Sequence, residues 1–255
     1  MMKKLIILVF SLITMLAIEV QAQSQTTDVV VRAVSKDAKF IGSSMGGAHI
    51  VIREVKTGKV LVEGVTEGST GDTDKLVRNP KVRYQELSTP DAAKFEAELS
   101  IDEPVFVEVS ATAPMAQKQS QVTSSTQLWL IPGKDITGDG IMLEIPGFAI
   151  DILQPQAHAT NTNNEIAITA NAVMMCGCPT SPGGVWDSSE MEFVAIISRG
   201  NEEVARKEMS FTGQSSTYET SFEPKQGGPY QIIVYGFDPR TGNTGLDRTT
   251  VISNQ

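Results

Sequence analysis

The chain has 255 residues, with 30 acidic and 21 basic side chains and a formal net charge of −9. Such an acidic protein is poorly suited to bind nucleic acid or an anionic lipid surface, because both partners are negatively charged. Hydrophobic residues make up 40% of the sequence and aromatic residues only 6%, so aliphatic side chains must supply most of any core, and the composition is not that of a disordered chain.

The first residues have the pattern of a secretory signal peptide. Two lysines precede an uncharged apolar run over residues 5–18, and a Val-Gln-Ala cleavage pattern ends at Ala22. The apolar run is shorter than the roughly 20 residues that a membrane-spanning helix needs. We therefore expect residues 1–22 to be removed as a signal peptide. The remaining chain is expected to be periplasmic or secreted, without stable insertion in a membrane.

Residues 23–146 are predicted to form a first β-sandwich domain. Two runs rich in β-branched residues, over 46–55 and 60–65, flank a Thr-Gly turn and predict a hairpin. The run over 94–101 contains helix-favouring Ala, Glu and Lys, but its apolar residues alternate strictly with polar ones, which favours a strand. Further strands are expected at residues 29–34, 105–109, 127–130 and 141–145.

A second domain is predicted over residues 147–255, after a short Pro-Gly break. Seven short strands separated by turn signals in roughly 105 residues are typical of an immunoglobulin-like sandwich. They are expected at residues 149–153, 166–175, 192–198, 203–211, 217–222, 230–237 and 248–252. The predicted fold class is thus all-β, with two tandem immunoglobulin-like sandwiches. Because the linker is short and apolar, we expect the two domains to pack against each other.

Two segments resemble known families. Residues 228–238, with the Gly-Asn-Thr-Gly run at 242–245, are similar to the last two strands of bacterial Ig-like domains. Residues 47–61 resemble the transthyretin-like and carboxypeptidase-regulatory-like domains of envelope proteins. Neither family is defined by an enzymatic activity, so these resemblances imply a β-sandwich fold and supply no reaction.

The most unusual chemistry of the sequence is a cluster of sulfur atoms. The only two cysteines are Cys176 and Cys178, and they directly follow Met174 and Met175. In a sandwich, this segment falls at the end of the second strand of the second domain. Antibody domains place a framework cysteine there, but the position of its partner, near Ile232, carries no cysteine. The two cysteines can therefore pair with each other, with another molecule or with a ligand.

Three interpretations of the Cys-Gly-Cys segment stay open. The first is a local disulfide, in which Gly177 tolerates the backbone angles of a tight ring. The second is a soft metal site, because thiolates and thioethers select Cu(I), and Met175, Met191 and His158 would complete the ligand shell. The third is thiol–disulfide exchange, although the common redox motif is Cys-x-x-Cys before a helix.

Residues around the cysteines supply further candidates. Trp186 ends a loop rich in Pro and Gly whose restricted backbone would hold the sulfur atoms in one geometry. We expect Trp186 to cap the core, or else to shield the site or contact a partner. Met45 and His49 could form a second soft site, or join the first one across the domain interface.

Three groups of acidic residues are candidate Ca²⁺ sites, although none has the spacing of a twelve-residue Ca²⁺ loop. They are Asp72 with Asp74, Asp135 with Asp139, and Asp238 with Asn243 and Asp247. The alternative role is in turns, because Asp and Asn side chains often bond to the backbone of a turn.

The sequence favours a binding protein over an enzyme. The chain has two histidines, both in β-rich or turn contexts, and no His-Glu-x-x-His helix. The leading hypothesis is an exported non-catalytic protein that binds Cu(I) through Cys176 and Cys178. The alternative is a structural or adhesive cell-envelope module with a local disulfide, which binds a protein or glycan partner and presents an apolar surface patch around Trp186. A thiol–disulfide redox partner is the third hypothesis.

Overall fold

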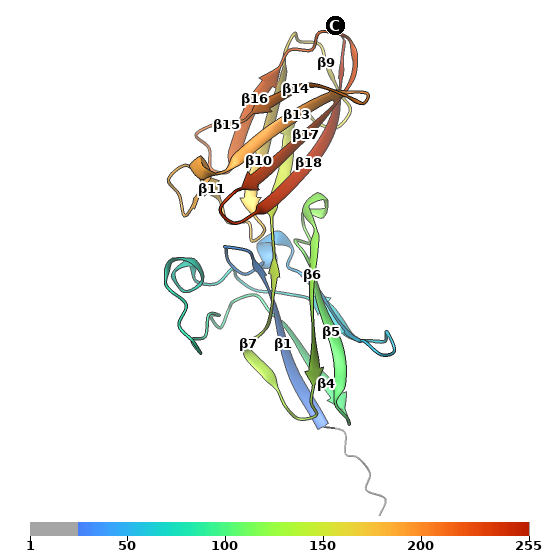
Figure 1. Ribbon diagram of the computed structural model, residues 1–255, viewed down its shortest axis with the longest axis vertical. Coiled ribbons are helices and arrows are strands. Elements are labelled where there is room, and N and C mark those ends of the chain that lie inside the picture. Colours follow the sequence, from blue (N-terminus) through green and yellow to red (C-terminus); the bar gives the residue numbers. More distant parts are fainter. Residues whose placement is uncertain (1–24, 255) are drawn as a thin grey trace, which may run out of the picture.

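The computed structural model describes residues 25–254, which form two β-sandwiches stacked end to end (Figure 1). The N-terminal sandwich uses residues 25–145 and the C-terminal sandwich uses residues 148–253. The prediction of an all-β chain with two tandem immunoglobulin-like sandwiches is confirmed. The predicted signal peptide, residues 1–22, lies outside the described residues.

The N-terminal sandwich consists of a three-stranded sheet, β4-β1-β7, and a four-stranded sheet, β3-β2-β5-β6. β1 is antiparallel to β4 and parallel to β7, and the four-stranded sheet is antiparallel throughout. The strands are β1 (Gln25–Ser35), β2 (His49–Glu54), β3 (Val60–Val65), β4 (Phe95–Ile101), β5 (Val105–Ala113), β6 (Val122–Leu130) and β7 (Ile136–Ile145).

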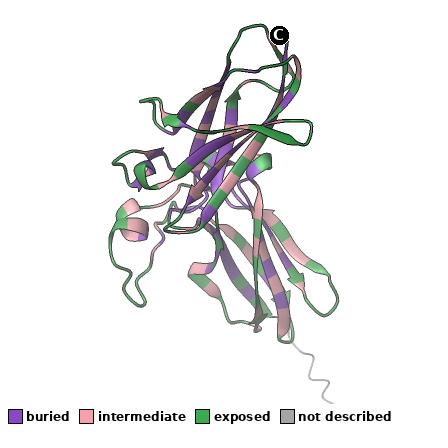
Figure 2. Ribbon diagram, turned by 45° about the horizontal axis from the view of Figure 1, so that its top comes forward, coloured by how far each residue is buried: buried purple, intermediate pink, exposed green. Residues whose placement is uncertain are grey.

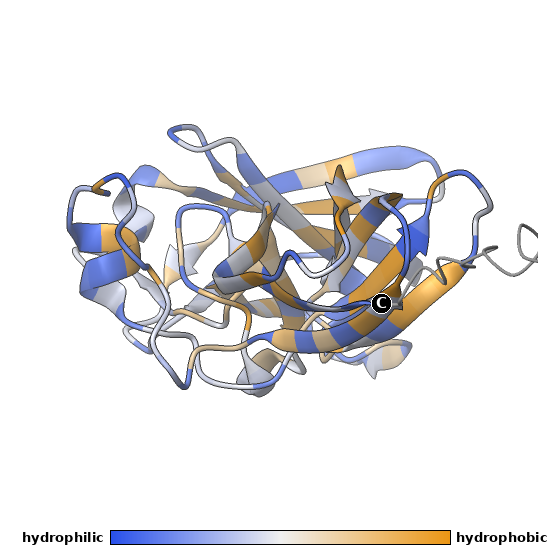
Figure 3. Cartoon of the chain, turned by 90° about the horizontal axis from the view of Figure 1, so that it is seen from below, coloured by the Kyte–Doolittle hydropathy of each residue, from blue (hydrophilic) through white to orange (hydrophobic). Residues whose placement is uncertain are grey.

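Alternation of side chains along these strands builds the core. In β5 the fully buried Val107, Val109 and Ala111 face the opposite sheet, and the residues between them face outward. The ambiguous run at 94–101 is the strand β4, because Leu99 and the other residues of its apolar face are packed into the core. The predicted β2–β3 hairpin is also confirmed. Hydrophobic and hydrophilic bands alternate along the strands in Figure 3.

The C-terminal sandwich pairs the sheet β15-β16-β10-β8 with the sheet β14-β13-β17-β18-β9. Its strands are β8 (Phe148–Gln154), β9 (Ala159–Asn161), β10 (Ile166–Met174), β13 (Glu192–Arg199), β14 (Glu202–Glu208), β15 (Ser210–Phe211), β16 (Thr217–Phe222), β17 (Gly228–Asp238) and β18 (Asn243–Ser253). Two very short parallel strands, β11 (Thr180–Ser181) and β12 (Trp186–Asp187), lie in the connection between β10 and β13.

One predicted strand is divided in the structure. The run over 203–211 was expected to be continuous, but it breaks at Met209 into β14 and β15. β14 pairs with β13 in one sheet, whereas β15 pairs with β16 in the other. Met209 is 9% exposed and belongs to the core, so the chain changes sheet where this side chain packs inside the sandwich.

A long connection between β3 and β4 adds a small third cluster of buried residues. Residues 74–78 of this connection form a π-helical turn, η2 (Asp74–Arg78). Leu76 of this turn packs with Phe40, Ala92 and Ala93. Three 3₁₀ turns complete the helical elements of the described residues: η1 (Ser43–Met45), η3 (Lys118–Ser120) and η4 (Ser188–Glu190). Within residues 25–254, no helix is long and apolar enough to cross a bilayer.

The two sandwiches share buried residues where they meet. Figure 2 shows buried segments inside both sandwiches and at their junction. Ala38, from the N-terminal part of the chain, belongs to the core cluster of the C-terminal sandwich. Ala149 and Met175, from the C-terminal part, belong to the core cluster of the N-terminal sandwich. The expectation that the two domains pack against each other is therefore confirmed.

Candidate functional site

The Cys-Gly-Cys segment forms a tight turn at the end of β10, where the sequence placed it. The Met174 N–H donates to the carbonyl oxygen of Cys178 at 3.0 Å, and the Gly177 N–H donates to the carbonyl oxygen of Met174 at 2.7 Å. Val173 and Pro179 form an isolated β-bridge beside the turn. The backbone itself therefore brings the two cysteines to the same side of the loop.

Cys176 and Cys178 are joined by a disulfide, with their Cα atoms 5.4 Å apart. Gly177, between them, has a φ of 77°, in the left-handed region that glycine adopts without steric cost. The two cysteines are only 1% and 4% exposed. The first of the three interpretations, a local disulfide, is confirmed.

Three methionines lie close to this disulfide in the chain or in space, and they pack in two different cores. Met174 belongs to the core of the C-terminal sandwich, as both cysteines do. Met175 turns the other way and packs in the core of the N-terminal sandwich. Met45 approaches from η1, so closely that a Cβ on Gly177 would lie 2.8 Å from its Sδ atom. Met45 thus contacts the Cys-Gly-Cys loop across the interface, while its predicted role as a soft-metal ligand stays a prediction.

The histidines do not join this cluster. His49 is partly exposed, and its Nε2 lies 3.7 Å from Oε2 of Glu63 on the neighbouring strand. His158 precedes β9, where its N–H donates to the carbonyl oxygen of Thr250, at the end of the sandwich away from the cysteines. His158 and the two cysteines lie at opposite ends of the C-terminal sandwich. The predicted Cu(I) ligand shell that includes His158 is therefore not assembled in this structure.

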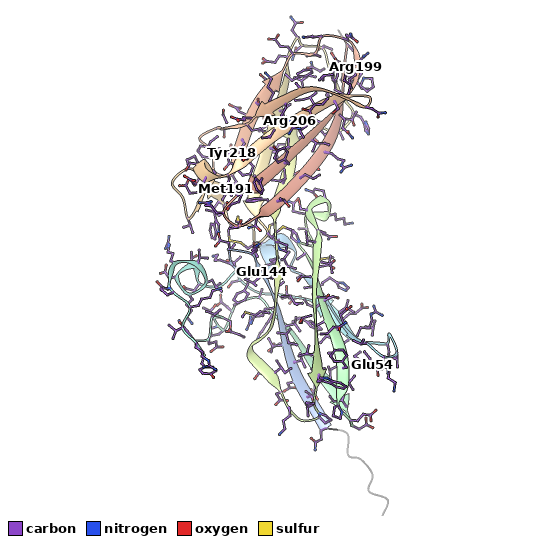
Figure 4. The ribbon with its side chains drawn as sticks, in the orientation of Figure 1. Glu54, Glu144, Met191, Arg199, Arg206 and Tyr218 are labelled. Atoms are coloured by element: carbon purple, nitrogen blue, oxygen red, sulfur yellow. A yellow bond between two sulfur atoms is a disulfide. The ribbon has the colours of Figure 1, made fainter. Side chains whose placement is uncertain are left out.

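Met191 lies at the junction end of the C-terminal sandwich, where Figure 4 labels it. Its side chain is partly buried against the same core that holds the disulfide. Across residues 25–254, no group of three His, Cys, Asp or Glu side chains lies in an arrangement that could hold a metal ion. The structure therefore gathers methionine sulfur at the junction and supplies no conventional metal centre.

Trp186 caps the core, which was the first of its predicted roles. It is 7% exposed, and its Nε1–H donates to the carbonyl oxygen of Asp37 at 2.9 Å. This hydrogen bond crosses from the C-terminal sandwich to the N-terminal one. An apolar surface patch around Trp186 was expected from the adhesive-module hypothesis, but it is absent from the described surface because the indole is buried between the sandwiches.

Asn243 joins the two sandwiches, and the sequence did not reveal this role. Its side chain is fully buried, and its Oδ1 accepts a hydrogen bond from the Gly147 N–H at 2.8 Å. Its Nδ2 donates to the carbonyl oxygen of Lys36 at 3.2 Å. The Gly-Asn-Thr-Gly run was the available signal, since an asparagine in that position can bond to backbone on two sides.

The charged groups nearest the junction are organised by Arg240. Burial would raise the pKa of Asp238, but hydrogen bonds and the positive charge of Arg240 outweigh burial and hold that pKa below its usual range. The Arg240 Nε and the Asp238 Oδ1 are 3.0 Å apart. Burial, followed by the charge of Asp238, raises the pKa of Asp37. Asp238 thus bonds to a guanidinium and to the backbone of its own turn, in accord with the turn alternative to a Ca²⁺ site.

The other candidate Ca²⁺ groups also bond to backbone N–H groups. The carboxylate of Asp139 accepts hydrogen bonds from the N–H groups of Leu87 and Ser88. Corresponding bonds are Asp28 N–H to Asp135, Lys75 N–H to Asp72, and Ile152 N–H to Asp247. Asp72 and Asp139 therefore hold turn and loop backbone in place, as the turn alternative predicted, whereas Asp135 and Asp247 bond to residues of β1 and β8.

Residues 42–46 have the Gly-x-Ser-x-Gly spacing of many hydrolase nucleophiles. In the structure this segment is the 3₁₀ turn η1 and does not form a sharp turn between a strand and an α-helix. The nearby His49 contacts Glu63 from a strand. The segment positions Met45 at the junction and does not have the geometry of a nucleophile elbow.

A second candidate site is the outer face of the sheet β3-β2-β5-β6. Trp129 of β6 is 59% exposed, and its ring centroid lies 5.1 Å from that of Phe106, directly opposite on β5. The next outward pair is Gln127 and Glu108, whose side chains are 3.4 Å apart. Period-two alternation in the predicted strand would have placed Trp129 on the side opposite the buried Leu130.

The sequence matches no described protein family and no curated protein. Among solved structures, the fibronectin(III)-like modules of Clostridium thermocellum CbhA are 11% identical over 90% of this chain and 94% of that chain, with a TM-score of 0.28. The interferon gamma receptor alpha chain of chicken is 12% identical over 90% of this chain and 98% of that chain, with a TM-score of 0.32.

An engineered protein is 12% identical over 49% of this chain, with a TM-score of 0.33, and the aligned part covers 24% of that protein's length. Similarities this low carry no argument about function. The fold assignment stands on the strand order and pairing described above.

Proposed function

We propose that this chain is an exported, non-catalytic binding module that holds a protein or glycan partner on the outer face of the sheet β3-β2-β5-β6. The observation that carries this proposal is the exposed Trp129, stacked beside Phe106 on a sheet face. A large aromatic ring that remains in water is a typical anchor for a partner, because burying it on binding removes much apolar surface.

The rest of this face carries polar pairs farther along the same two strands. Thr112 and Thr123 lie opposite each other with their Oγ1 atoms 2.7 Å apart, and Ser110 lies opposite Ser125. A row of hydroxyl pairs on the same sheet face as an exposed aromatic ring suits an extended glycan, whose rings have one apolar face and many hydroxyls. The hydroxyl pairs also suit the polar rim of a protein interface.

The disulfide supports the exported location. Disulfides persist in oxidising compartments such as the periplasm and the extracellular space, and they are rare in the reducing cytoplasm. The Cys176–Cys178 bond is buried, so the fold encloses it as a structural part of the junction. Thiol–disulfide exchange is disfavoured, because an attacking thiol would have to reach two enclosed sulfur atoms.

The two tryptophans of the chain allow a direct binding test. In a Trp186→Phe variant, the fluorescence comes from the exposed Trp129 alone. Soluble hexasaccharides of glucose, xylose and N-acetylglucosamine, and purified envelope proteins, are then titrated into it. A ligand on this face should shift the emission to shorter wavelength and lose at least about tenfold in affinity in a Trp129→Ala variant. If every partner that binds the wild type binds Trp129→Ala equally well, the proposed face is wrong.

Cu(I) binding in the reduced state is a second candidate function, and the position of Met45 favours it. Its thioether lies against Gly177, so a reduced Cys176 and Cys178 would have a third sulfur ligand at hand. Intact mass separates the states, since the disulfide form is about two daltons lighter than the dithiol form. Cu(I) titration under reducing conditions tests the site. A stoichiometry that survives the double substitution of both cysteines by serine would exclude it.

A further inference from the structure

The connection between β3 and β4 carries a cluster of positive charge on an acidic protein. Residues 75–85, here called the basic tip, contain Lys75, Arg78, Lys81 and Arg83 and no acidic residue. The whole chain has a net charge of −9, so the chain outside the tip carries −9 − 4 = −13. The basic tip is therefore a positively charged region on a chain whose remaining net charge is negative.

The basic tip also exposes the two most solvent-accessible large hydrophobic side chains of the described residues. Tyr84 is 89% exposed and Val82 is 66% exposed. The Gln85 N–H donates to the carbonyl oxygen of Val82 at 3.1 Å, which closes a turn with Arg83 and Tyr84 at its centre. The guanidinium carbon of Arg83 lies 4.6 Å from the centroid of the Tyr84 ring. The turn thus presents a tyrosine and an arginine together.

Tyr84 occupies a backbone conformation that tyrosine adopts at a cost. Its φ is 66°, in the left-handed region, where glycine would be the favoured residue. Among the described residues, Arg83 is the only one that makes an aromatic or cation–π contact with the Tyr84 ring. A strained, outward tyrosine that contributes little packing points to a role in binding.

The base of the tip is firmly attached to the N-terminal sandwich. Arg32, which is 4% exposed, donates from Nη1 to the carbonyl oxygens of Ala92 at 2.7 Å and Ala93 at 2.9 Å. Asp139 accepts hydrogen bonds from the backbone directly after the tip. In Figure 1 this teal segment projects from the side of the N-terminal sandwich, away from the outer face that holds Trp129 on β6. The tip is therefore a projection on an anchored base.

We propose that the basic tip docks an acidic segment of a partner protein. Lys75, Lys81 and Arg83 attract and orient the carboxylates, while Tyr84 and Val82 become buried at the centre of the contact. Tyrosine and arginine are enriched among residues that dominate interface energies, and opposite charge speeds association. The proposal deepens the proposed binding function and rests on it for the kind of partner, but it uses a surface separate from the Trp129 face.

A narrow acidic segment fits the tip better than a flat anionic membrane does. Asp72, Asp74 and Glu86 flank the tip, and a membrane surface would have to approach them as well. Arg78 is paired with Asp74, with its Nη1 3.1 Å from Oδ1, so the cations that a peptide strand would contact are Lys75, Lys81 and Arg83. At physiological ionic strength, salt largely screens exposed charges that lie more than about 8 Å apart. The positive charge of the tip itself therefore determines how strongly an acidic segment is attracted to it.

The test uses the full mature chain and a fluorescein-labelled peptide with four Glu-Glu-Leu repeats, followed by fluorescence anisotropy. We expect binding that weakens as NaCl increases, and a loss of at least about tenfold in affinity for Lys81→Gln with Arg83→Gln. The matched control is Lys56→Gln with Lys59→Gln, on the exposed β2–β3 turn, which should bind like the wild type. The same peptide with Gln in place of Glu should not bind.

A Tyr84→Gly variant separates binding from folding. Glycine removes the strain of the positive φ, so the thermal midpoint should stay the same or rise, while affinity for the peptide should fall about tenfold. Equal affinity in Tyr84→Gly and wild type would overturn the proposal, as would failure of the wild type to bind the acidic peptide more tightly than the Gln peptide.

Two other occupants give distinct outcomes. Tyr84-dependent sedimentation with vesicles of phosphatidylethanolamine and phosphatidylglycerol, without peptide binding, would assign the tip to a membrane and overturn the proposal. Self-association in sedimentation velocity that is lost in Tyr84→Gly would assign it to a second copy of the chain. Trp129→Ala should leave peptide binding unchanged, so the failure of one surface can be distinguished from the failure of the other.

Discussion

At the scale of single residues, Gly177 shows how closely the two sandwiches approach each other. It has a positive φ, and it leaves room for the sulfur of Met45 where any other residue would place a Cβ. Gly183, in the exposed loop that follows, has a φ of 69° and open space around it. The two glycines share a backbone conformation and differ in their surroundings.

Gly177→Ala should therefore lower the free energy of unfolding by about 1–3 kcal/mol, because it combines the cost of the positive φ with displacement of Met45. Gly183→Ala is the control and should cost only about 1 kcal/mol, from the backbone alone. Urea unfolding of both variants measures the difference. Equal losses would show that the contact with Met45 is loose.

The Asp238–Arg240 pair predicts a pH dependence. Because the pKa of Asp238 is lowered in the folded state, its ionised form stabilises the fold above the unfolded pKa of about 3.9. This stabilisation is lost as the pH falls through the lowered folded pKa. Arg240→Ala should cost about 1–2 kcal/mol at neutral pH, discounted for the half-exposed guanidinium, and the cost should shrink toward pH 2.

Chemical unfolding of wild type and Arg240→Ala between pH 2 and 7 measures that change. Arg206→Ala, which removes an exposed ion pair with Glu203, is the control and should cost less than Arg240→Ala at neutral pH. A loss in Arg240→Ala that is the same at every pH would contradict the assigned role of Asp238.

At the scale of elements, the β3–β4 connection depends on a single buried cation. Burial lowers the pKa of Arg32, and the negative charge of Asp139 acts in the opposite direction. Its guanidinium bonds to two consecutive carbonyl groups of the loop and lies over the ring of Phe40, 5.4 Å from the centroid. Arg32 therefore attaches the loop to β1.

Arg32→Met should release this loop while the sandwiches remain folded. Hydrogen exchange measured by mass spectrometry should increase over residues 79–94, and trypsin should cleave faster within the basic tip. Arg53→Met is the control, because Arg53 is exposed and bonds only to a nearby turn carbonyl. Unchanged exchange over residues 79–94 would show that the loop is held by other contacts.

The elements that the sequence predicted are those with local signals. Alternation identified β4, and turn residues identified the β2–β3 hairpin. The division at Met209 was missed, because an apolar residue in a strand looks the same whether the strand stays in its sheet or changes sheet. The attachment by Arg32 was also missed, since its carbonyl partners lie 60 or more positions away.

The candidate site, like the strands, was predictable only where its signal is local in the sequence. The closeness of Cys176 and Cys178 in sequence made a local disulfide one of three options. The distance of His158 from them could not be read from the sequence, because it depends on which end of the sandwich each loop occupies. The role of Asn243 depends on Lys36, on the other side of the junction.

At the scale of the whole molecule, the junction determines whether the two sandwiches behave as one body. Asn243 bonds to the Gly147 N–H in the linker and to the Lys36 carbonyl across the junction, and Trp186 adds a second hydrogen bond across it. The disulfide loop and Met45 fill the space between them. These contacts are buried, so they should couple the unfolding of one sandwich to that of the other.

Asn243→Ala should break this coupling. It leaves the Gly147 N–H and the Lys36 carbonyl without their partner, at a cost of about 2–4 kcal/mol. Scanning calorimetry should show one transition for the wild type and two for the variant. Asn161→Ala, which removes a local and exposed hydrogen bond, is the control and should leave one transition. A single transition with an unchanged midpoint in Asn243→Ala would contradict this role.

Met175 and Ala149, which pack in the N-terminal core, also determine the order in which a newly made chain can fold. The ribosome produces both residues after every strand of the N-terminal sandwich has been made. The N-terminal strand β1 must likewise wait for β7, its parallel neighbour. The first half of the protein therefore remains incomplete during synthesis until the second half has begun to follow it.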